Sequence, residues 1–131
     1  MNTMKSAFKI LLGLTLLLSL GFCFFYKPGP VWKDGSYQVY QMDGGKRLGL
    51  YSDPGYFGLI PEVVVAAGSN KEWVVAEQNA KGERRFYIIR KPVKNEFPDD
   101  PEGPFTLDEY NKKVITLGLP PFSWRDPRAE K

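Results

Sequence analysis

The sequence predicts an α+β protein: an N-terminal transmembrane or signal helix, then an antiparallel β-meander of five or six strands, with one C-terminal helix packed on the sheet. Three observations lead to this prediction. Residues 10–26 form an apolar run without a charge. Short runs rich in β-branched and aromatic residues alternate with turn motifs over residues 37–90, which is typical of a meander. A capping-box motif at residues 106–109, TLDE, then opens a stretch with helical periodicity.

The apolar run begins at Ile10, ends at Tyr26 and is bounded by Lys9 and Lys27. A helix over these residues would span about 26 Å, close to the roughly 30 Å of bilayer hydrocarbon. This length favours an uncleaved transmembrane helix. Lysines on its N-terminal side predict a cytoplasmic N-terminus and a domain in the periplasm or outside the cell.

Two other interpretations of the N-terminus remain open. Small residues at Ser19 and Gly21 also suit a secretory signal that is cleaved after Gly21, which would release a periplasmic or secreted domain. Cys23 is a candidate lipidation site, which would make the protein a lipoprotein. Phe22 is larger than the residue that usually precedes a lipidated cysteine, and apolar rather than polar residues follow Cys23.

These patterns divide the chain into four parts. Residues 1–27 are the anchor or signal segment, and residues 28–36 are a linker that starts with Pro-Gly-Pro. Residues 37–124 are the small α+β domain, a size that suits one hydrophobic core. Residues 125–131 are predicted to form a flexible tail.

The meander is predicted from runs of strand-forming residues that are separated by glycine-rich or proline-containing turns. The continuously apolar fourth run is typical of a buried strand. In the fifth run, Trp73, Val75 and Glu77 share one face. Residues 91–104 hold several prolines and acids and predict a long loop. The predicted strands are residues 37–42, 47–51, 56–60, 62–67, 72–78 and 84–90.

The C-terminal helix has start and stop signals. Thr106 can accept from the Glu109 amide while Glu109 reaches back, and Phe105 can pack on Tyr110. Gly118 is a suitable C-cap. The apolar positions recur at helical spacing and predict one face that packs on the sheet. These positions are Leu107, Tyr110, Val114 and Leu117.

Residues 72–120 contain a strand WVVAEQ, a strand FYII, a helix start GPFT and a helix end LGLP. In these motifs the segment resembles an uncharacterised family of small bacterial envelope proteins, whose members commonly carry a lipoprotein signal. The resemblance implies a shared α+β fold and an envelope location. It implies no activity, because the matching positions are a cap, a helix stop and two strands.

Composition argues against catalysis. The chain has no histidine, the usual general base and commonest metal ligand, and its single cysteine lies in the apolar run. We therefore predict that the protein is not an enzyme and holds no cofactor or metal. The three N-terminal lysines account for the net charge of +3, because the other 15 of the 18 basic residues balance 15 acidic ones. A neutral domain lacks the basic face that nucleic-acid binding needs.

These observations favour a membrane-tethered binding domain that acts through protein–protein contact, as an immunity-type or envelope accessory protein. The expected partners are the membrane, through residues 10–26, and an unknown protein. The alternatives are a structural subunit of a membrane complex and a carboxylate-dependent envelope enzyme. The candidate contact surface joins a basic strand end to an acidic loop. A solvated strand edge is the favoured interpretation of the basic residues, and a solvated loop rather than a site for a hard cation is the favoured interpretation of the acids. Its residues are Arg84, Arg85, Arg90, Lys91, Lys94, Glu96, Asp99, Asp100 and Glu102.

Overall fold

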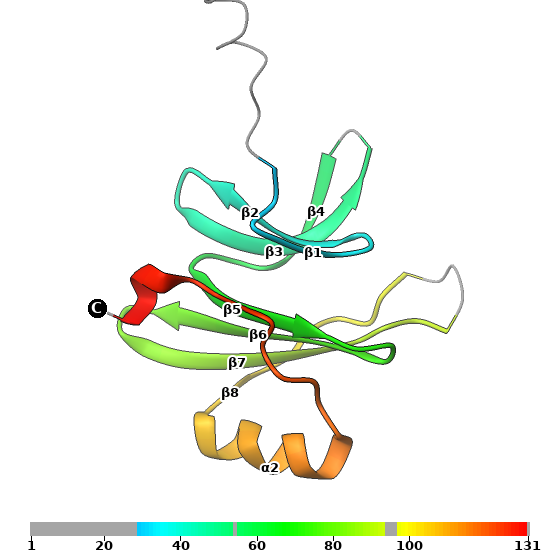
Figure 1. Ribbon diagram of the computed structural model, residues 1–131, viewed down its shortest axis with the longest axis vertical. Helices are drawn as coiled ribbons and strands as arrows, with labels where there is room; N and C mark the ends of the chain where they lie inside the picture. The colour runs from blue at the N-terminus through cyan, green and yellow to red at the C-terminus, as the bar shows by residue number, and fades with distance from the viewer. Residues whose placement is uncertain (1–28, 54, 94–96, 131) are drawn as a thin grey trace, which may run out of the picture.

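Two antiparallel sheets and one helix stack as three layers in the computed structural model (Figure 1). The structure describes residues 29–53, 55–93 and 97–130. The predicted membrane segment at 10–26 and the candidate lipidation site Cys23 lie outside the described residues. Within the described part of the chain, no helix combines the length and apolar character needed to cross a bilayer.

The outer layer, sheet 1, has the strand order β1-β2-β3-β4. Consecutive strands pair, as expected for a chain in which short turns separate strand-forming runs. The pairing of β3 with β4 contains a β-bulge. Leu48 pairs with Ile60 and Gly49 pairs with Gly58, so Leu59 is the extra residue on the β4 side. The strands are β1 (Trp32–Asp34), β2 (Tyr37–Met42), β3 (Gly45–Ser52) and β4 (Gly55–Ile60).

The middle layer, sheet 2, has the order β8-β7-β6-β5-β9. The β6–β7 hairpin turns through Lys81 and Gly82, both at positive φ, and the Asn79 side chain accepts from the Gly82 amide at 2.9 Å. The strand nearest the C-terminus returns to pair Arg125 with Ala66. The strands are β5 (Val64–Ser69), β6 (Trp73–Ala80), β7 (Glu83–Arg90), β8 (Glu102–Phe105) and β9 (Trp124–Arg125).

The helix α2 (Leu107–Leu117) covers the free face of sheet 2 (Figure 1). Both hydrogen bonds of the predicted capping box are present, and Gly118 caps the C-terminus with φ 66°. Tyr110 stacks on Phe86 of β7 with ring centroids 4.7 Å apart. The apolar face is narrower than its spacing predicts, because Leu107 and Leu117 stay 42% and 37% exposed.

Strand β6 supplies both hydrophobic cores because its side chains alternate between the two faces of sheet 2. Val74 and Ala76 point into the core between the sheets, with Val39, Leu48 and Ile60 among its other members. The opposite face packs under the helix. That second core contains Trp73, Val75, Phe86, Ile88, Tyr110 and Leu119.

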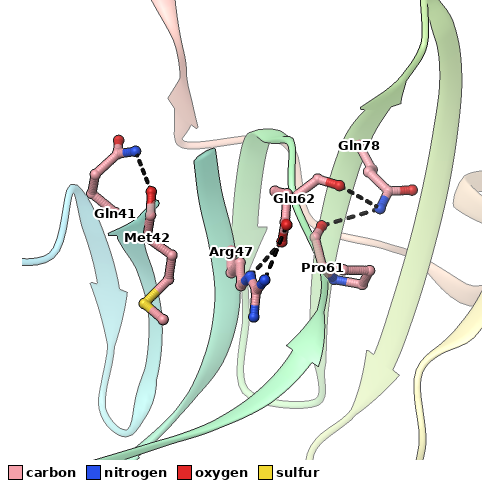
Figure 2. A network of polar contacts seen from close by, with 6 residues as sticks. All are labelled: Gln41, Met42, Arg47, Pro61, Glu62 and Gln78. Atoms are coloured by element: carbon pink, nitrogen blue, oxygen red, sulfur yellow. Dashed lines mark hydrogen bonds and ion pairs between the residues drawn. The ribbon is translucent and has the colours of Figure 1, made fainter. Parts of the chain in front are cut away.

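The segment between the sheets is fixed by polar side chains (Figure 2). Buried Gln78 donates to the carbonyl oxygens of Pro61 and Glu62 at 3.1 and 3.3 Å. Arg47 of β3 holds the Glu62 carboxylate with two hydrogen bonds, one of them 3.0 Å long. The crossover from β4 to β5 (residues 61–63) is therefore tied to both sheets. Buried amide and carbonyl groups need hydrogen-bond partners, and these contacts supply them.

The structure confirms the α+β class, the antiparallel meander and the single C-terminal helix within the described residues. The strand count differs, because residues 29–130, where the structure describes them, form nine strands in two sheets rather than one sheet of five or six strands. β1 lies in the predicted linker, and β8 lies at the end of the predicted loop. The predicted flexible tail also differs: Arg125 belongs to β9, Asp126 is buried, and η1 (Pro127–Glu130) is a 3-10 helix.

Candidate functional site

An open groove lies where the chain after β7 meets one end of sheet 1, and its volume is about 640 Å³. Three segments line it: residues 34–37 at the β1–β2 turn, residues 50–52 with Phe57 from β3 and β4, and the described loop residues 91–92 and 97–98. The loop predicted from its prolines and acids thus packs against sheet 1. We call this hollow the groove.

Aromatic side chains line much of the groove. Phe97 from the loop meets Phe57 from β4 edge to face, with ring centroids 5.1 Å apart, yet the two residues remain 69% and 55% exposed. Tyr37 is buried beside them, and burial is the main reason why the pKa of its phenol is raised, with the charges of Asp34 and Asp99 adding to it. Exposed aromatic pairs of this kind are common in contact surfaces.

An ion pair joins the two sheets in the groove. Lys91 Nζ donates to Asp34 Oδ2 at 2.5 Å, and Ser69 Oγ donates to the same oxygen at 2.6 Å. The hydrogen bonds from Lys91 and then Ser69 lower the pKa of Asp34. The lysine ammonium also lies 5.8 Å from the centroid of the Tyr37 ring. A carboxylate held in its charged form by two donors is a poor proton acceptor at neutral pH.

The candidate contact residues from the sequence are not all in one place. Lys91 lines the groove, and Arg90 beside it faces Glu72 at 3.7 Å. Asp99, Asp100 and Glu102 are exposed along the loop and β8. Lys94 and Glu96 lie outside the described residues. Arg84 and Arg85 lie at the other end of β7, about 20 Å away at the rise of an extended strand.

Arg84 has a structural partner that sequence reasoning missed. It donates through Nε and Nη2 to Glu77 at 3.2 and 3.1 Å, and Arg125 of β9 donates to Glu77 at 3.2 Å. Only 5% of the Glu77 side chain is exposed. Burial raises the pKa of this carboxyl, but the hydrogen bonds from both arginines outweigh burial and lower it. The sequence did contain a signal of this buried acid: Glu77 shares one face of its strand with the apolar residues Trp73 and Val75.

The groove combines exposed apolar rings with a fixed ion pair. Among the residues that line it, Asp34 supplies the one carboxylate, and this carboxylate is already paired. In the described residues, no three His, Cys, Asp or Glu side chains gather as a metal site would need. Apolar rings beside a fixed ion pair can instead receive a side chain of a partner.

Comparison of the chain with protein-family models, with curated proteins and with solved structures finds no match. The resemblance to small envelope proteins therefore stays a prediction from the motifs in residues 72–120.

Proposed function

We propose that the protein is a membrane-tethered, extracytoplasmic binding domain that acts by inserting part of a protein partner into the groove. The observation that carries the proposal is the exposed Phe57–Phe97 pair beside the Asp34–Lys91 ion pair. Loops supported by a rigid sheet commonly carry recognition, and aromatic residues dominate binding energies. An immunity-type protein that blocks a toxin in the envelope is one concrete form of this function.

The tether in this proposal is the helix over residues 10–26, with the N-terminus in the cytoplasm. Only a few linker residues separate Tyr26 from β1, so sheet 1 would stand within about 20 Å of the bilayer. An intact mass of the mature protein tests this part. An uncleaved chain has 14.9 kDa. Loss of the residues up to Gly21, or a lipid added at Cys23, would contradict a simple transmembrane tether.

Site-specific photo-crosslinking in cells tests the groove without knowledge of the partner. A photoreactive amino acid at Phe97 is expected to capture one defined protein. The matched control is the same substitution at Ile115, which is 85% exposed on the helix. If both positions give the same products, the groove is not the contact surface. An immunity role further requires that the captured protein be toxic in cells that lack this chain.

The acidic part of the loop gives a second test. Asp99→Lys and Asp100→Lys are expected to lower the yield of the Phe97 crosslink about threefold or more, because rim charges guide encounter. Arg85→Glu is the control, since Arg85 lies at the far end of β7 and pairs with exposed Glu83. Equal yields in all three variants would remove the acidic loop from the contact surface.

A further inference from the structure

Strand β4 differs from the other sheet edges that the structure describes. Those edges are β1, β8 and β9, of three, four and two residues, whereas β4 has six. β1 carries Lys33 and Asp34, β8 carries Glu102 and a proline, and β9 carries Arg125. Short length, charge and proline are the usual ways in which proteins block pairing at an edge. β4, with the sequence GYFGLI, has none of these features.

The first part of β4 is accessible. Residues 55–58 are all exposed, and the bulge lies beyond them, where Ile60 rather than Leu59 pairs with Leu48. Tyr56 stacks on Tyr40 of the outer face with ring centroids 3.8 Å apart, so its backbone is well supported. An edge strand leaves alternate N–H and C=O groups unpaired, and a second strand can add there.

We propose that β4 pairs antiparallel with β4 of a second copy of this chain, so that sheet 1 continues across a twofold axis. Self-pairing sets β4 residues opposite β4 residues, and like charges at such positions would repel. The strand has no charge, so this cost is absent. The exposed Phe57 and Phe97 of both copies would flank the axis and lose apolar surface to water.

The geometry also fits two copies in one membrane. In a continuous sheet the twofold axis is perpendicular to the sheet, so the same face of both copies points to the same side. Residues 29–31 leave sheet 1 on the side away from sheet 2 (Figure 1). The two N-terminal segments would therefore begin on one side. A single strand pair is smaller than standard interfaces, and the proposed tether would compensate by raising the local concentration.

Gly58 is the position for the test, because a side chain fits there and lies outside the groove. A Cβ on Gly58 would meet the Tyr40 hydroxyl at 3.9 Å, an ordinary contact. Two full-length copies with different tags are produced together in membranes, and capture of one tag is followed by measurement of the other. The variants are Gly58→Lys in both copies, Gly58→Lys with Gly58→Glu, and Ile115→Lys in both copies as the control.

The wild-type copies are expected to be captured together. Gly58→Lys in both copies should lower co-capture about fivefold or more, and the mixed Lys/Glu pair should restore it, because opposite charges attract across a strand pair. Ile115→Lys should change nothing. Absence of wild-type co-capture, full co-capture with Gly58→Lys in both copies, or failure of the mixed pair to restore it would each overturn the proposal. Because Phe97 would lie near the axis, a Phe97 crosslink to a second copy should be lost in Gly58→Lys, whereas a crosslink to a different protein should persist. The identity of the crosslinked product therefore lets the two proposals fail separately.

Discussion

The buried carboxylate of Glu77 offers the sharpest test of how the strands of sheet 2 are held together, because Glu77 lies on β6, Arg84 on β7 and Arg125 on β9. The perturbation is Arg84→Met and Arg125→Met, singly and combined. Together the two arginines supply the three hydrogen bonds to Glu77, between 3.1 and 3.2 Å long. The double variant leaves this carboxylate without a cation, while the two methionines keep most of the packing volume.

The expected loss in the free energy of unfolding depends on how exposed the two arginine side chains are to solvent. Removing one partner of a fully buried ion pair costs about 3–5 kcal/mol. Arg84 and Arg125 are 51% and 35% exposed, so solvent screens each contact. We therefore expect about 1–2 kcal/mol for each single variant and about 3–4 kcal/mol for the double variant.

The pH dependence has a definite sign. In the wild type the pKa of Glu77 is lowered, so its contribution to stability is present above the unfolded-state value of about 4.3 and is lost as the pH falls. In the double variant burial acts alone and raises the pKa, so protonation relieves the buried charge. The stability gap between wild type and variant should therefore be wide at pH 7 and narrower at pH 4.

Urea unfolding of the full chain in a non-ionic detergent, followed by circular dichroism at both pH values, measures this gap. The control is Arg90→Met on the same strand, where arginine and Glu72 are both 58% exposed. Like Arg84, Arg90 lies over an aromatic ring, so the control also loses a cation–π contact. Its cost should stay below about 1 kcal/mol. A double variant no less stable than the control, or an equal gap at both pH values, would refute the reasoning.

Three further substitutions test other contacts by thermal or urea unfolding. Gly68→Ala should cost about 1–3 kcal/mol, because its Cβ would lie 2.1 Å from the Pro121 carbonyl oxygen; unchanged stability would mean that this approach is not tight. Thr106→Ala should cost about 1 kcal/mol through loss of the helix N-cap, and Thr106→Ser should recover most of it. Lys46→Met should cost about 1–3 kcal/mol by leaving buried Asp126 without its cation. The hydrogen bond from Lys46 is the main cause of the lowered pKa of Asp126, so this last cost should fade as the pH falls below about 3.9; a cost independent of pH would contradict it.

Local signals predicted much of the fold. The capping box works through residues three apart, and the glycine turns work through their own dihedral angles, so both can be read from short stretches of sequence. The helix, its Gly118 cap and the six predicted strands all appear within a few residues of their expected bounds.

Long-range pairing explains what sequence reasoning missed. β8 and β9 are short, and each is a strand because it pairs with a strand distant in sequence, β7 and β5 respectively. β1 is also short and is a strand because it pairs with the adjacent β2. The split into two sheets depends on the crossover held by Gln78 and Arg47, which no local pattern predicts. Arg84 and Arg90 lie at opposite ends of β7 for a simpler reason: an extended strand carries its two ends far apart.

The pairing of β9 with β5 has a consequence for biosynthesis. Ala66 is made long before Arg125, yet the two lie side by side in the finished sheet. Until β9 docks, a nascent chain presents the apolar strand β5 with a bare edge, which is the kind of surface that aggregates. This edge of β5 can therefore be covered only after residues 124–125 have been translated.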